Sequence, residues 1–82
     1  MLSVTDSLTK VFNRLKMDEV FIQEIDTSNR YSSPLSVIMM DVDFFKKIND
    51  EHGHIVGDNV LVKIAQLTKS NLRRNDFLGR WG

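Results

Sequence analysis

Two carboxylates near the middle of this 82-residue chain follow an apolar run and precede a short helical pattern. The apolar run 37–40 is unbroken, and Asp41 and Asp43 come within three residues of its end. Carboxylate oxygens are the hard ligands that Mg²⁺ prefers, and the free N–H groups at the start of a helix attract anions. The stretch therefore suits a divalent metal ion beside a phosphate group. Helix capping is the alternative for both residues, and for Asp43 capping alone is a sufficient explanation.

The elements that position these carboxylates follow from apolar spacing and turn residues. The segment 35–42 predicts a strand buried on both faces, and 77–81 predicts a second strand. Asn13 predicts the N-cap of a helix over 14–27, and Gly53 predicts the end of a short helix over 44–50. A second long helix is predicted over 58–73. Its apolar stripe at helical spacing is Leu61, Ile64, Ala65, Thr68 and Leu72.

Composition narrows the class of protein. The 11 basic and 11 acidic residues give zero formal net charge, which indicates neither a polyanion-binding surface nor a membrane-surface patch. The chain has no cysteine, which excludes disulfides and thiolate metal sites. No apolar run approaches the roughly 18 residues of a membrane span, and no signal peptide is visible. We expect one small cytoplasmic domain without a nucleic-acid partner, although a longer parent protein could be anchored to a membrane.

Four pieces of the sequence together resemble the GGDEF family, the diguanylate cyclase domains of bacteria. They are DSLTKVFNR (6–14), MDVDFFKKIND (40–50), GHIVGD (53–58) and RRND (73–76) leading into RWG (80–82). The second and third pieces, at this spacing, are the most specific. Lys10 departs from the pattern, because the family usually has glycine there. The family's signature would begin at Gly82.

The resemblance implies an α+β fold of ferredoxin-like (βαββαβ) type, of which residues 1–82 form about the first half. It implies an enzyme that condenses two GTP molecules into cyclic di-GMP and releases pyrophosphate, with two subunits facing each other as a homodimer. Mg²⁺, or Mn²⁺, would be held by the carboxylate of Asp41 and the backbone carbonyl of Val42. A second carboxylate would come from the signature that follows.

The same resemblance assigns the nucleotide contacts. The backbone N–H groups of Phe44, Phe45 and Lys46, with the Lys46 ammonium, would hold the triphosphate. Asn49 and Asp58 would read guanine, because a carboxylate can accept from the N1–H and N2–H₂ donors that adenine lacks. Alternatively, Asp58 is the N-cap of the long helix and Asn49 is a residue at the C-terminal end of the short helix.

Two further positions have a role only by resemblance. Arg73 and Asp76 resemble the R-x-x-D inhibitory site that binds the product, and arginine can hold a phosphate with two parallel hydrogen bonds. The alternative for Arg73 is a cation placed at a helix end by the helix dipole. His54 would lie near the nucleotide, and its role stays open because a single histidine is more often structural.

Two functions compete on this sequence. The first is the GTP- and metal-binding half of a diguanylate cyclase, and the second is a degenerate or truncated module that binds GTP or cyclic di-GMP without turnover. The residues after Gly82 would distinguish them. Residues 1–82 alone are expected to be inactive. They are also expected to self-associate through the edge 35–42, to repack locally, or to be the ordered part of a longer molecule, because the strand between 36–42 and 77–81 would be missing.

Overall fold

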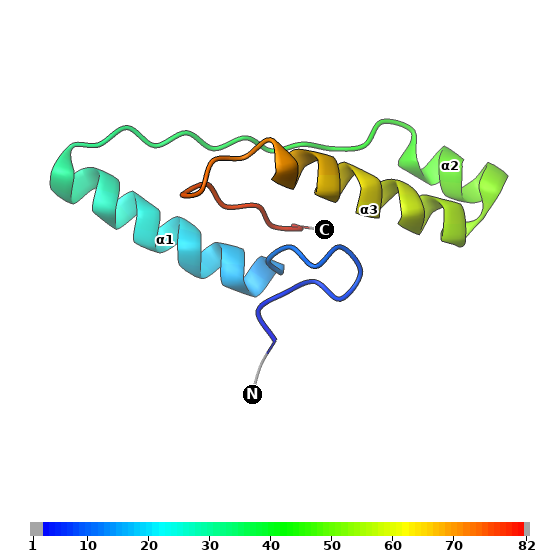
Figure 1. The fold of residues 1–82 in the computed structure, drawn as a ribbon, viewed down its shortest axis with the longest axis horizontal. Coiled ribbons are helices and arrows are strands. Elements are labelled where there is room, and N and C mark those ends of the chain that lie inside the picture. Colours follow the sequence, from blue (N-terminus) through cyan, green and yellow to red (C-terminus); the bar gives the residue numbers. More distant parts are fainter. Residues whose placement is uncertain (1–2, 82) are drawn as a thin grey trace.

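The computed structural model describes residues 3–81, which contain three helices (Figure 1). They are α1 (Arg14–Tyr31), α2 (Phe45–His52) and α3 (His54–Ser70). An extended segment runs from the end of α1 to α2, where it appears in green in Figure 1. The residues after α3 return toward the N-terminal turn, with which they form backbone hydrogen bonds.

Helix α1 begins where the sequence predicts and ends four residues later than predicted. The Asn13 side chain accepts a hydrogen bond from the N–H of Lys16 at 2.9 Å, which confirms the predicted N-cap. The helix continues to Tyr31 and ends when Ser32 adopts a left-handed conformation with φ of 52°. The connection between this helix and Pro34 is therefore shorter than a helix end at residue 27 would leave, because nothing breaks the helix before the residues that lead into Pro34.

The two predicted strands are absent from the described part of the chain. Residues 33–42 are extended but pair with no neighbour, and Ile38 and Met39 are 82% and 75% exposed instead of buried. The segment 77–81 contributes a single parallel bridge between Gly79 and Phe12, and Phe12 also forms an antiparallel bridge with Thr5. A strand needs a neighbour for its backbone hydrogen bonds, and within residues 3–81 the segment 35–42 has none.

The boundaries of the two later helices also differ from the prediction. Gly53, with φ of 88°, ends α2 as predicted. The same residue directly precedes α3. Helix α3 therefore begins at His54, and Asp58 lies inside it, so the N-cap alternative for Asp58 is wrong. Phe44 precedes α2 in a left-handed conformation with φ of 60° and no side-chain cap, so Asp43 does not cap the helix.

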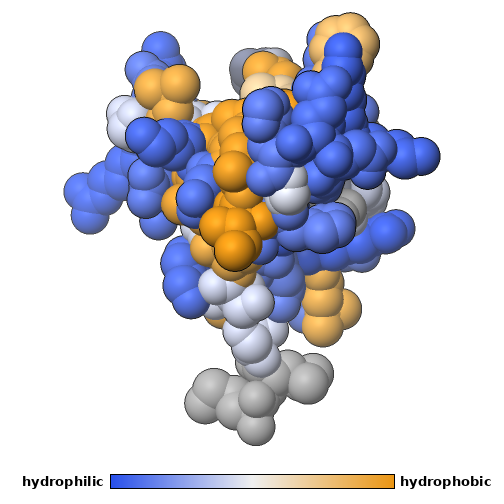
Figure 2. All heavy atoms as spheres, turned by 90° about the vertical axis from the view of Figure 1, so that its right-hand side faces the viewer, coloured by the Kyte–Doolittle hydropathy of each residue, from blue (hydrophilic) through white to orange (hydrophobic). Residues whose placement is uncertain are grey.

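The core of residues 3–81 is small and open on one side. The buried apolar side chains are Val11, Val20 and Ala65. An apolar groove of about 750 Å³ lies beside them and is lined by residues of the extended segment 37–42, α1, α3 and the C-terminal segment. Figure 2 shows exposed apolar side chains between hydrophilic ones at one end of the molecule. No helix within residues 3–81 has the length and hydropathy needed to span a bilayer.

Candidate nucleotide and metal site

The predicted metal ligands lie at the end of the extended segment, just before the turn that leads into α2. Asp41 is exposed, and one of its carboxylate oxygens accepts the N–H of Val42 at 2.9 Å. The Val42 carbonyl accepts the N–H of Phe45 at 3.2 Å. The Asp41 carboxylate and the Val42 carbonyl each keep further lone pairs, so both can serve as oxygen ligands of a hard cation such as Mg²⁺. Within residues 3–81 no group of three or more acidic or histidine side chains converges as a complete metal site.

The turn that opens α2 leaves two N–H groups for a ligand. The Phe45 N–H is occupied by the Val42 carbonyl, whereas the N–H groups of Phe44 and Lys46 donate to no residue outside the helix among those described. Lys46 is exposed, and its ammonium group forms no ion pair within residues 3–81. Lys47, by contrast, lies 3.8 Å from Glu51. Two of the three predicted amides and the ammonium group of Lys46 are thus without a partner among residues 3–81.

Asn49 lies at the contact between α2 and α3. Its Oδ1 is buried and accepts no hydrogen bond among the described residues. A β-carbon on Gly57 would lie 1.7 Å from that oxygen and 3.4 Å from the Phe45 ring, so only glycine permits this approach. Asp58, the next residue, is exposed on α3. The two predicted guanine-reading residues therefore lie on adjoining helices that Gly57 brings close together, a role for Gly57 that the sequence analysis did not identify.

His54 is the first residue of α3 and is exposed. Its side chain takes part in no ion pair or hydrogen bond within residues 3–81, whereas the His52 side chain lies 3.9 Å from Glu51. The structure therefore leaves the role of His54 open.

Arg73 and Asp76 form a closed turn beyond the end of α3. The Arg73 N–H donates to the Asp76 carboxylate at 2.8 Å, and the Asp76 N–H donates to the Arg73 carbonyl at 3.1 Å. Helix α3 ends at Ser70, so Arg73 is not a cation in its last turn, and the dipole alternative is wrong. Both residues line a hollow of about 560 Å³. Its other cationic lining residues are Lys10, Lys69 and Arg74.

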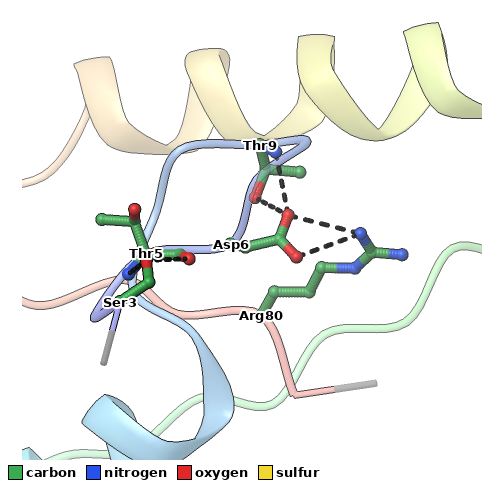
Figure 3. A network of polar contacts seen from close by, with 5 residues as sticks. All are labelled: Ser3, Thr5, Asp6, Thr9 and Arg80. Atoms are coloured by element: carbon green, nitrogen blue, oxygen red, sulfur yellow. Dashed lines mark hydrogen bonds and ion pairs between the residues drawn. The ribbon is translucent and has the colours of Figure 1, made fainter. Parts of the chain in front are cut away.

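A polar cluster joins the two ends of the described chain (Figure 3). The Asp6 carboxylate accepts the N–H of Thr9 at 2.9 Å and its hydroxyl at 2.8 Å. Arg80 Nη1 lies 3.4 and 3.3 Å from the two Asp6 oxygens. Burial raises the pKa of Asp6, but the two Thr9 donors and the Arg80 guanidinium outweigh it, so the pKa lies below its ordinary value. The sequence analysis treated these residues only as parts of matched motifs.

Comparison with known proteins identifies the family. The family model described as "Diguanylate cyclase, GGDEF domain" matches residues 3–82. This chain belongs to the GGDEF family. Gly82, where the GGDEF signature would begin, lies outside the described residues.

Relatives of this GGDEF chain agree in sequence and in fold. It is 46% identical over 77 residues to diguanylate cyclase DosC of Escherichia coli K12, covering 94% of this chain and 17% of that protein. A sensory box/GGDEF family protein from Caulobacter crescentus superimposes with a TM-score of 0.91 at 35% identity, covering 98% of this chain and 51% of that one. A microbial GGDEF domain studied for its interaction with cyclic di-GMP gives a TM-score of 0.81 at 28% identity, covering 99% of this chain and 53% of that one. The chain therefore spans about half of the solved GGDEF structures and a smaller part of the curated relative.

Proposed function

We propose that this chain is the GTP- and metal-binding half of a diguanylate cyclase domain, which condenses two GTP molecules into cyclic di-GMP with release of pyrophosphate. One observation carries the proposal: Asp41 is followed within five residues by a turn with free N–H groups and by the unpaired ammonium of Lys46. Carboxylate, amides and ammonium together match a metal-bound triphosphate. The diguanylate cyclase relative supports the same reaction.

The metal would be held by the Asp41 carboxylate and the Val42 carbonyl, completed by ligands from outside the described residues. When bound, Mg²⁺ or Mn²⁺ neutralises charge on the phosphates. The chain's own part is to bind and orient the triphosphate, through the N–H groups of Phe44 and Lys46 and the Lys46 ammonium. The Phe45 N–H contributes through its hydrogen bond to Val42, because that bond keeps the metal-binding carbonyl in place.

Guanine would be recognised by Asp58 and Asn49. Asp58 is exposed on α3, where its carboxylate is free to accept the N1–H and N2–H₂ protons. Asn49 is held against Gly57 between the two helices, so its amide group has a defined position before nucleotide binds. His54, exposed at the start of α3, would lie on the same side without an assigned contact.

Arg73 and Asp76 would form a product-inhibition site. Their reciprocal backbone turn leaves the Arg73 guanidinium without a partner among residues 3–81, free to bind a phosphate of cyclic di-GMP. We expect Arg73→Ala to relieve product inhibition while the initial rate stays nearly unchanged. Arg30→Ala, at an exposed arginine on α1, is the matched control. Inhibition that persists unchanged in Arg73→Ala would contradict this site.

The complete domain would be a ferredoxin-like sandwich that works as a homodimer. In that sandwich the extended segment 35–42 becomes a paired strand, which would cover the apolar groove beside Ile38 and Met39. The enzyme domain would face the cytoplasm, where GTP is present, whether or not its parent protein is anchored to a membrane.

Incubation of the complete protein with GTP and Mg²⁺, with detection of cyclic di-GMP, tests this function. We expect product from the native protein and almost none from Asp41→Asn. Asp26→Asn, which removes a carboxylate charge from an exposed position of α1, should stay active. Binding of GTP without product would favour a sensing module, and equal activity of the two variants would exclude Asp41 as a metal ligand.

A further inference from the structure

Residues 6–14 and residues 77–81 are joined by three kinds of side-chain contact: an ion pair, a stack of two rings and a cation–π contact. Asp6 and Arg80 form the ion pair described above, although 74 positions separate them in the sequence. The Phe12 and Phe77 rings stack with their centroids 6.4 Å apart. The Arg14 guanidinium lies 4.8 Å from the centre of the Trp81 ring.

Backbone hydrogen bonds also join residues 6–14 to residues 77–81, and this contact is called the seam. The Phe12 N–H donates to the Leu78 carbonyl at 3.1 Å, and the Arg80 N–H donates to the Phe12 carbonyl at 2.9 Å. A β-carbon on Gly79 would lie 1.7 Å from Cγ of Met17, so the segment lies directly against α1 at this point. Residues 77–81 thus have a defined position without belonging to a strand.

The Asp6–Arg80 pair differs from the other ion pairs of the described residues. Its side chains are 20% and 34% exposed, whereas those of Asp26 and Arg30 on α1 are 68% and 64% exposed. The Asp26–Arg30 pair joins residues four apart on one helix. A partly buried ion pair between distant residues can fix one segment against another, whereas exposed local pairs contribute little.

The seam faces the proposed metal site. Gly79, Arg80 and Trp81 line the same apolar groove as Asp41 and Val42. Movement of the C-terminal segment would therefore change the distance across the groove to Asp41. Both Thr9 donors bind one oxygen of Asp6, Oδ2, and Arg80 Nη1 lies 3.3 Å from that oxygen and 3.4 Å from the other (Figure 3).

We propose that Asp6, Thr9 and Arg80 form a positioning clamp that fixes the segment 77–81 relative to the Asp41 carboxylate, as catalysis requires. These three are positioning residues, which act through the backbone of Gly79–Trp81 and do not touch the nucleotide. The catalytic part of this inference rests on the proposed function, whereas the structural part, that the clamp holds the seam, does not.

Amide hydrogen exchange on the complete protein tests the structural part without any activity. In Asp6→Asn and Arg80→Lys, we expect the Phe12 and Arg80 N–H groups to exchange at least about tenfold faster than in the native protein. Asp26→Asn and Arg30→Lys remove the same chemical groups from the exposed pair and should leave these two amides unchanged. Unchanged exchange in the clamp variants would overturn the proposal.

Steady-state kinetics test the catalytic part. Asp6→Asn, Arg80→Lys and the mild variant Thr9→Val should lower kcat by about 10- to 100-fold, because small displacements of catalytic groups are costly. The KM for GTP should change by less than about twofold, since none of the three touches nucleotide. Val20→Ala, which destabilises α1 from the core, should lower the melting temperature at least as much and keep kcat near the native value.

The outcomes separate the two proposals. A native protein that makes no cyclic di-GMP would refute the proposed function, and the exchange result would still decide whether the clamp exists. Faster exchange with an unchanged kcat would overturn the positioning role. A loss of kcat in Val20→Ala equal to that in Arg80→Lys would also overturn it, because general destabilisation would then explain both.

Discussion

Lys10 offers a direct test of backbone strain at the position where this chain departs from the family pattern. Lys10 has φ of 64°, and its N–H donates to the Asp6 carbonyl at 2.9 Å, so the turn forms despite the missing glycine. A residue with a β-carbon in this left-handed region costs roughly 1–2 kcal/mol. Lys10→Gly removes that cost, but glycine also increases the entropy of the unfolded chain by about 0.4–1 kcal/mol. The midpoints of these two ranges leave an expected net stabilisation of about 0.8 kcal/mol.

Thermal and urea unfolding of the complete protein would measure this gain. A shift of about 1–4 °C is expected for a domain of about 150–250 residues. Lys10→Ala is the matched control, because it removes the same side chain and charge but keeps a β-carbon at positive φ. Lys10→Gly that is no more stable than Lys10→Ala would show that the turn stores no strain.

Four further outcomes are expected. Gly57→Ala should weaken GTP binding, because the new β-carbon would displace the Asn49 amide. An affinity for GTP that calorimetry finds unchanged would contradict the packing of Asn49 against Gly57. Asp58→Ala should cost roughly 1.5–3 kcal/mol per lost charge-assisted bond for GTP and little for ATP in paired binding titrations; equal losses would remove its role in base selection. The pKa of Asp6 is lowered, so its carboxylate stabilises the folded protein at pH values above its ordinary pKa of about 3.9. This stabilisation is lost as the pH falls below that value. The difference in unfolding free energy between the native protein and Asp6→Asn should therefore shrink in acid. Residues 1–82 produced alone should make no cyclic di-GMP and should self-associate in sedimentation, and a cooperative, active monomer would refute both expectations.

Local interactions account for the features that the sequence alone determined. The Asn13 cap, the stop at Gly53 and the helical character of the three segments each depend on hydrogen bonds within a few residues. The family, too, follows from short motifs at fixed spacing, which the family model confirms. The position of Asp41 before a helix start is likewise a property of neighbouring residues, and the structure retains it.

Contacts between distant segments decided the rest. The run 35–42 has the composition of a buried strand, but strand formation needs a partner, and within residues 3–81 it has none. Helix α3 begins at His54, four residues earlier than predicted, because Gly53 alone turns the chain between the two helices. Gly57 therefore lies inside α3, where it contacts Asn49 of α2. The Asp6–Arg80 pair was beyond sequence analysis for the same reason: no periodicity or spacing relates residues 74 positions apart, and only the folded chain brings their charges together.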